Sequence, residues 1–136
     1  MKRLIFPLGL ALLAGCAMND PAETRMAESD RASLAAALEG YEQAGPAVSC
    51  VNQRDLQGNR SAGEGAIVFQ GRTNGMLWVN RPAGGCPSLN WGRTLVTRTP
   101  STQLCRGDIA NVVDLGSGGQ YGGCGLGDFT PYRRVR

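Results

Sequence analysis

The chain has 136 residues, 14 basic and 11 acidic, which is enough for one small domain. It contains no histidine, which excludes mixed cysteine and histidine zinc ligation and the usual base of a hydrolytic triad. The only lysine is Lys2, which excludes the lysine of a nucleotide-binding P-loop.

The first fifteen residues have the layout of a signal peptide. Lys2 and Arg3 precede an apolar run from Leu4 to Leu13, and the small residues Ala14 and Gly15 follow. The run is too short for a membrane span, which needs about 20 residues. A buried helix is the alternative, but a proline and a glycine inside the run weaken it. We therefore predict that residues 1–15 are an export signal.

The sequence LAGC at 13–16 resembles the lipobox of bacterial lipoproteins. In that family the cysteine thiol receives a diacylglyceryl group, cleavage occurs just before it, and the new amino group is acylated. The resemblance implies that Cys16 is a lipid attachment site and not a structural thiol, because two or more acyl chains hold a protein firmly on a membrane. The next residue is Ala17 and not aspartate. By the same resemblance, we expect an outer-membrane protein that faces the periplasm.

Residues 16–46 are expected to form a lipid-anchored tether and a short helix. Residues 17–28 are small and polar and favour a flexible tether. Residues 29–43 favour a helix capped by Ser29 or Asp30, and the sequence AGP at 44–46 ends it. The sequence leaves open whether this helix packs on the rest of the protein.

From residue 47 onward the pattern predicts short strands. The segments at 47–53, 92–99 and 103–115 are strand candidates, the last broken near Gly107. Residues 66–71 and 76–81 form the arms of a hairpin, because Asn74-Gly75 is a strong turn signal.

The end of the chain predicts a loop and one more strand. Residues 116–127 contain seven glycines and favour a loop held midway by Cys124. Residues 128–136 favour a last strand, which Pro131 would confine to a sheet edge. We therefore expect residues 47–136 to be a mainly β domain, a small antiparallel curled sheet or open barrel.

Four cysteines remain after Cys16, and an even number in an exported domain favours two disulfides. They are Cys50, Cys86, Cys105 and Cys124. A four-cysteine zinc site is the alternative, but 35, 18 and 18 residues separate them, and zinc ligands usually come in close pairs. A C-x-x-C redox pair is also absent. Three disulfide connectivities are open from the spacing alone.

Most of the predicted β domain resembles a group of small proteobacterial envelope lipoproteins that carry a domain of unknown function. The runs that carry the resemblance are CVNQRDL (50–56), IVF (67–69), WVNR (78–81), CPSL (86–89), TQLCRGDI (102–109) and CGLGDFTPY (124–132). The resemblance implies a compact β-rich domain with paired cysteines and no established activity. A shorter pattern in the group keeps only the equivalents of Cys86 and Cys105. The resemblance thereby implies Cys86–Cys105 and Cys50–Cys124 as the two bridges.

No catalytic machinery is recognisable in the sequence, and we expect no catalytic residue, metal or cofactor. Asp108, Asp114 and Asp128 are the candidates for acid and base work on a glycan, but acidic residues beside glycines are typical of turns. Trp78 lies in a hairpin arm and is expected to be buried or half-buried. Trp91 lies in a predicted loop and is the better candidate for a ligand contact.

Charge is unevenly distributed along the chain. Residues 16–47 carry two arginines and six acidic residues, whereas residues 48–136 carry ten arginines and five acidic residues. This asymmetry suits either an anionic partner or a solvated surface, and we favour the second because the only basic cluster is the tail RRVR. We expect no nucleic-acid partner.

Taken together, these features predict a lipid-anchored binding or scaffolding module whose partner is an envelope protein or a glycan. A small carboxylate-dependent peptidoglycan hydrolase is the alternative from a different class. An inhibitor-type module is a weaker third.

Overall fold

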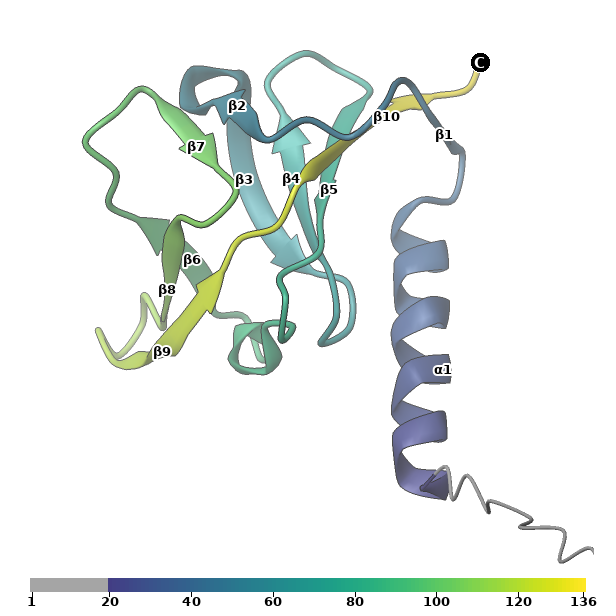
Figure 1. Cartoon of the computed structure of the whole chain (residues 1–136), viewed down its shortest axis with the longest axis vertical. Coiled ribbons are helices and arrows are strands. Elements are labelled where there is room, and N and C mark those ends of the chain that lie inside the picture. The colour runs from purple at the N-terminus through teal and green to yellow at the C-terminus, as the bar shows by residue number, and fades with distance from the viewer. Residues whose placement is uncertain (1–19) are drawn as a thin grey trace, which may run out of the picture.

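A computed structural model describes residues 20–136 of the chain. The predicted signal peptide at 1–15 and the predicted lipid attachment site Cys16 lie outside the described residues. In the described part, a helix is followed by ten strands (Figure 1). The helix α1 spans Pro21–Ala37, and two short 3-10 helices, η1 and η2, span Gln53–Asp55 and Pro87–Leu89.

The strands form three antiparallel sheets. The strands are β1 (Tyr41–Gln43), β2 (Cys50–Asn52), β3 (Leu56–Ser61), β4 (Ile67–Gly71), β5 (Met76–Asn80), β6 (Thr94–Thr97), β7 (Gln103–Cys105), β8 (Ile109–Val113), β9 (Gln120–Gly125) and β10 (Phe129–Arg134). The largest sheet has the order β1-β10-β5-β4-β3, and the smaller ones are β2-β7 and β6-β8-β9. The prediction of a mainly β, antiparallel fold with a helix before it is confirmed, and no sheet of residues 20–136 closes into a barrel.

The predicted hairpin is confirmed. Strands β4 and β5 pair antiparallel, and Gly75 between them has a φ of +81°, a backbone conformation that glycine adopts without a steric penalty. The break predicted near Gly107 is also present, because β7 ends before it and β8 begins after it.

The helix begins earlier than predicted and ends sooner. The side chain of Asp20 accepts a hydrogen bond from the Ala22 N–H at 2.9 Å, and Pro21 occupies the first turn. A capping aspartate followed by proline is a strong helix start, so residues from 21 onward are helical where a tether was expected. Tyr41, expected on the helix, belongs to β1, which pairs with β10. The largest sheet therefore begins before the predicted domain boundary at residue 47.

Two further predictions are wrong in the C-terminal region. Residues 120–125 form strand β9 where a loop was expected, because β8 pairs with this glycine-rich segment. Strand β10 lies inside the largest sheet and is not an edge strand. Pro131 is tolerated there because β1 ends at Gln43, so no strand residue beyond it needs an N–H from Pro131. The Ala44 N–H still donates to the Pro131 carbonyl at 2.9 Å, and pairing on that side resumes at the bridge between Val48 and Phe129.

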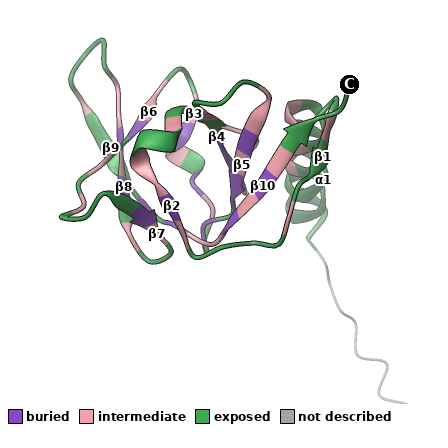
Figure 2. Cartoon of the chain, turned by 90° about the horizontal axis from the view of Figure 1, so that it is seen from above, coloured by how far each residue is buried: buried purple, intermediate pink, exposed green. Residues whose placement is uncertain are grey.

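The largest sheet is covered on both faces. Successive side chains of a strand point to opposite faces, and along β4 Ile67 and Phe69 join the main core while Val68 points the other way. Val68 and Val79 pack against the C-terminal end of α1, which contributes Leu34. The first half of α1 is exposed, as Figure 2 shows in green.

A hydrogen bond also holds the helix to the β domain. The Asp30 carboxylate accepts a hydrogen bond from the Glu64 N–H at 2.7 Å, in the loop between β3 and β4. Gly63 in that loop has a φ of +77°, and a Cβ there would lie 2.9 Å from the Asp30 Cα. Glycine at position 63 allows this close approach, which adds to the apolar packing of the helix on the domain.

All four described cysteines form disulfides, but not in the pairs that the family resemblance implies. The bridges are Cys50–Cys105 and Cys86–Cys124, and not Cys86–Cys105 and Cys50–Cys124. Strand register decides the first bridge, because pairing of β2 with β7 places Cys50 opposite Cys105 with their Cα atoms 4.0 Å apart. The second joins the start of η2 to an inward-facing residue of β9, with the Cα atoms 5.4 Å apart.

A buried asparagine closes the fold near its C-terminus. Asn80 is fully buried, its side-chain amide donates to the Gly127 carbonyl at 2.7 Å, and its side-chain oxygen accepts from the Gly127 N–H at 2.9 Å. The Asn80 side chain therefore pairs with Gly127 as the backbone of a neighbouring strand would. It satisfies the Gly127 N–H and carbonyl, which burial would otherwise leave without partners.

Candidate functional site: an aromatic and arginine cluster

Trp91 is the most exposed large apolar side chain of residues 20–136 and has unusual backbone geometry. Its side chain stands in the turn between η2 and β6, and the residue is 80% exposed. Its φ is +60°, and no other residue in the described part of the chain except glycine has a positive φ. A bulky residue in this left-handed region costs about 1–3 kcal/mol, and such residues concentrate at functional sites.

The local sequence explains how the turn forms around Trp91. The Asn90 side chain donates to the Pro87 carbonyl at 2.9 Å, which closes the turn from η2. Gly92 follows with a φ of +75°, so two successive residues take left-handed conformations before β6 begins. The bridge between Cys86 and β9 holds the start of this segment. The turn therefore directs the indole outward instead of into the core.

Arg93 joins Trp91 to a second aromatic ring. The guanidinium carbon of Arg93 lies 3.5 Å from the ring centre of Tyr121 on β9 and 5.1 Å from that of Trp91. One Arg93 nitrogen donates to the Ser88 carbonyl at 3.2 Å. Stacking on an aromatic face and a hydrogen bond hold the guanidinium in place. We call Trp91, Arg93 and Tyr121 the aromatic cluster.

Asp114 lies at the border of the aromatic cluster, in the turn between β8 and β9. Its carboxylate accepts hydrogen bonds from the Ser117 N–H at 3.2 Å and the Gly116 N–H at 2.8 Å. These two backbone donors hold the pKa of Asp114 below its ordinary value, and the positive charge of Arg93 lowers it further. Asp114 is therefore ionised at neutral pH.

The three aspartates considered for catalysis occupy turns and strand ends, the positions expected for turn residues. Asp108 and Asp114 flank β8, so their Cα atoms lie about 20 Å apart. That separation exceeds the roughly 5–10 Å between the carboxyl groups of glycosidases. Asp108 accepts from the Cys105 N–H at 2.8 Å, and Asp128 forms an ion pair with Arg106 at 3.3 Å.

The sequence analysis named Trp91 as the candidate for a ligand contact but did not name its two neighbours. Arg93 is two residues away in a strand candidate, and nothing in the sequence distinguishes it from the other arginines. Tyr121 comes from the glycine-rich segment that was expected to be a loop. The prediction for Trp78 is confirmed, because it is half-buried and packs against the main core.

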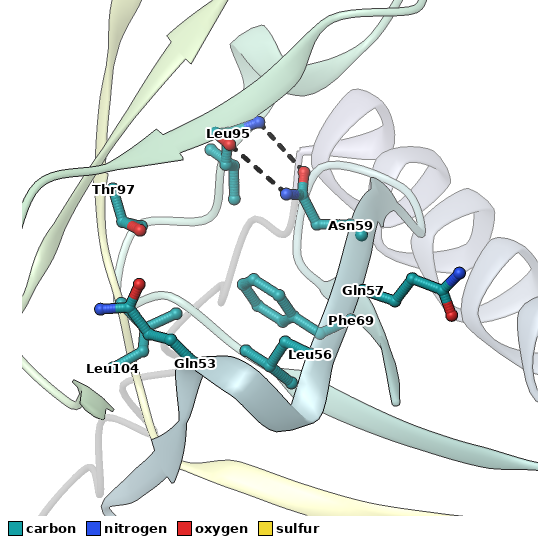
Figure 3. Close-up of a pocket in the computed structure, with 9 residues that line it drawn as sticks. Gln53, Leu56, Gln57, Asn59, Phe69, Leu95, Thr97 and Leu104 are labelled. Carbon is teal, nitrogen blue, oxygen red and sulfur yellow. Dashed lines mark hydrogen bonds between the residues drawn. The ribbon is translucent and has the colours of Figure 1, made fainter. Parts of the chain in front are cut away.

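Apart from the aromatic cluster, a hollow opens between β3 and β6 (Figure 3). Its volume is about 180 Å³, and its lining residues are Gln53, Leu56, Gln57, Gly58, Asn59, Phe69, Leu95, Thr97 and Leu104. Asn59 crosses it, accepting from the Leu95 N–H at 3.0 Å and donating to the Leu95 carbonyl at 3.4 Å. Ligand pockets for drug-sized molecules usually measure 300–1,000 Å³, so this hollow is smaller than the usual ligand pocket.

Two further properties of the described residues bear on the site. No three Cys, Asp or Glu side chains in residues 20–136 gather closely enough to hold a metal ion. No helix in that range has the length and apolar character that crossing a membrane requires.

Comparison of the chain with family models, with curated proteins and with solved structures finds no match in any of the three. The resemblance to envelope lipoproteins therefore stays a prediction from the sequence.

Proposed function

We propose that the protein is a lipid-anchored component of the bacterial envelope, held in the outer membrane through Cys16 and facing the periplasm. In this proposal its disulfide-linked β domain binds an envelope component and catalyses no reaction. Two disulfides support an oxidising compartment, because disulfides are rare in reducing ones. The lipid anchor rests on the lipobox resemblance at 13–16.

A single observation carries the binding role, namely the outward projection of Trp91 against its backbone preference. An indole that is 80% exposed gains no stability from burial in the fold, and its φ of +60° adds strain. Tryptophan, tyrosine and arginine are also the residues that dominate binding surfaces. A binding partner supplies the burial that the fold itself does not.

The hydrolase alternative has less support. The carboxylate of Asp108 accepts a backbone hydrogen bond within its own turn, and one oxygen of the Asp128 carboxylate pairs with Arg106. Asp114 is about 20 Å along β8 from Asp108, too far to act with it on one glycosidic bond. The described residues favour binding over carboxylate catalysis.

Two experiments in cells test the two parts of the proposal. Radiolabelled palmitate should enter the wild-type protein and not Cys16→Ser, and no label in the wild type would refute the lipid anchor. A photo-crosslinking phenylalanine analogue at position 91 should give a discrete adduct in intact cells. The matched control places the same analogue at Met26, an exposed position on α1. Identical adducts from both positions, or none from position 91, would refute the binding site.

A further inference from the structure

We propose that the aromatic cluster binds a sugar ring that carries a carboxylate, as in an acidic glycan. This inference rests on the proposed binding function and names the ligand class for the same site. The ring would stack on Trp91, and its carboxylate would pair with the guanidinium of Arg93.

The guanidinium of Arg93 is held in place without an ion pair, which indicates an anionic group on the ligand. Its guanidinium is held over the Tyr121 ring, and one of its nitrogens donates to the Ser88 carbonyl. The ion pairs of residues 20–136 are Arg106–Asp128 and Arg133–Glu42, so no carboxylate of that range lies within 4.0 Å of Arg93. A guanidinium has five N–H donors in a planar fork that matches a carboxylate with two parallel hydrogen bonds. Arg93 is therefore a positioned donor with capacity left for an anion.

The exposure of the Trp91 indole indicates that the ligand has a ring with an apolar face. The indole is 80% exposed and lies on an open surface, so a ligand can lie across it without entering a pocket. One face of a pyranose ring presents C–H groups, while its edge presents hydroxyl groups that stay in water. An amphipathic ring of this kind buries its apolar face on the indole, and its polar edge stays solvated. A ring within a long glycan strand has the same access as a free sugar.

Charge favours a carboxylate over a more highly charged anion. Residues 48–136 carry ten arginines and five acidic residues, which attracts anions to the domain. Asp114 follows Val113, which pairs with Thr94, so its carboxylate lies on the Arg93 side of these strands and opposes additional negative charge at the site. A single carboxylate therefore fits better than a phosphate. An acidic peptide also carries carboxylates, but it has no rigid ring to cover Trp91.

The test is a titration of the protein, purified from membranes in detergent, followed by tryptophan fluorescence. The probe is tri-galacturonic acid, and its methyl ester is the matched probe with the same rings and no charge. We expect the acid to quench the Trp91 emission and to bind at least tenfold more tightly than the ester, with the difference shrinking as salt is raised. The Trp91→Gly variant, in which Trp78 is the only tryptophan, supplies the reference emission.

Two variants separate the role of the Trp91 indole from that of the planar Arg93 guanidinium. Arg93→Lys keeps the charge but loses the planar fork, and it should bind the acid about tenfold more weakly. Arg98→Lys is the matched control at the opposite end of β6, and it should bind like the wild type. Trp91→Gly should abolish quenching with an unchanged or higher melting temperature, because glycine takes a φ of +60° without strain.

Several outcomes would overturn the inference. Equal binding of acid and ester would remove the role of the carboxylate, and unchanged affinity in Arg93→Lys would remove the role of the fork. Tetraglutamate or inorganic phosphate binding as tightly as the sugar acid would assign the site to another ligand class. If no saccharide binds while the analogue at position 91 still crosslinks in cells, the ligand class is wrong and the binding function stands. If both fail, the proposed function fails as well.

Discussion

The two disulfides provide the sharpest test of how this fold is stabilised. The perturbation is the removal of each bridge by a double alanine substitution, Cys86→Ala/Cys124→Ala in one variant and Cys50→Ala/Cys105→Ala in the other. The bridges close segments of similar length, with sequence separations of 38 and 55 residues. They differ in environment, because Cys86 and Cys124 are buried in the main core while Cys50 and Cys105 are half-buried.

The magnitudes follow from chain entropy and from packing. Closing segments of these lengths stabilises a fold by about 4 kcal/mol for either bridge. Chain entropy alone therefore predicts nearly equal losses, slightly larger for Cys50–Cys105. Cys86 and Cys124 are 1% and 5% exposed. Removing the sulfur of either residue therefore also removes one buried group and leaves a small cavity. Such a group is worth about 1 kcal/mol. We expect losses of about 4 kcal/mol for Cys50→Ala/Cys105→Ala and about 5–6 kcal/mol for Cys86→Ala/Cys124→Ala.

Equilibrium unfolding in urea at 25 °C, without reductant, measures both values. Loss of either bridge should also raise the dependence of the free energy on urea, because the unfolded chain becomes more expanded. Since small domains have about 5–15 kcal/mol in total, the core variant should be close to the limit of folding. A larger loss in Cys50→Ala/Cys105→Ala would refute the argument that burial in the core decides the order.

Three further predictions concern contacts between elements. Gly63→Ala should destabilise the fold by about 1–2 kcal/mol and speed hydrogen exchange in α1, since the new Cβ meets Asp30; unchanged exchange would contradict the anchoring contact. Asn80→Ala should cost about 2–4 kcal/mol in thermal unfolding because the Gly127 backbone loses both partners, and a loss below 1 kcal/mol would count against it. For Asp114→Asn, the lowered pKa means that the ionised carboxylate stabilises the native state above about pH 4, and that this contribution disappears as the pH falls through the native pKa. The stability difference between wild type and Asp114→Asn should therefore shrink on acidification, and a constant difference from pH 7 to pH 2 would be inconsistent with it.

Local signals in the sequence were sufficient for several elements. The Asn74-Gly75 pair predicts the β4–β5 hairpin because Gly75 supplies locally the left-handed residue that the turn uses. By contrast, β3 was missed, since its polar residues and Gly58 lack the alternation that marks a strand. Strand β3 exists because β4 pairs with it along one edge. Pro131 was misplaced for the same reason, because the number of strands beside it is decided elsewhere in the chain.

The amino-acid sequence by itself determined the mainly β character, the turn at Asn74-Gly75, the even set of four cysteines and the suitability of Trp91 as a contact residue. These depend on residue type and on near neighbours. Only the tertiary structure decided which cysteines pair, because strand register brings Cys50 opposite Cys105. It also decided the aromatic cluster, because Tyr121 reaches Arg93 only once the glycine-rich segment pairs with β8. Contacts between residues far apart in the chain arise from packing, and no local pattern encodes them.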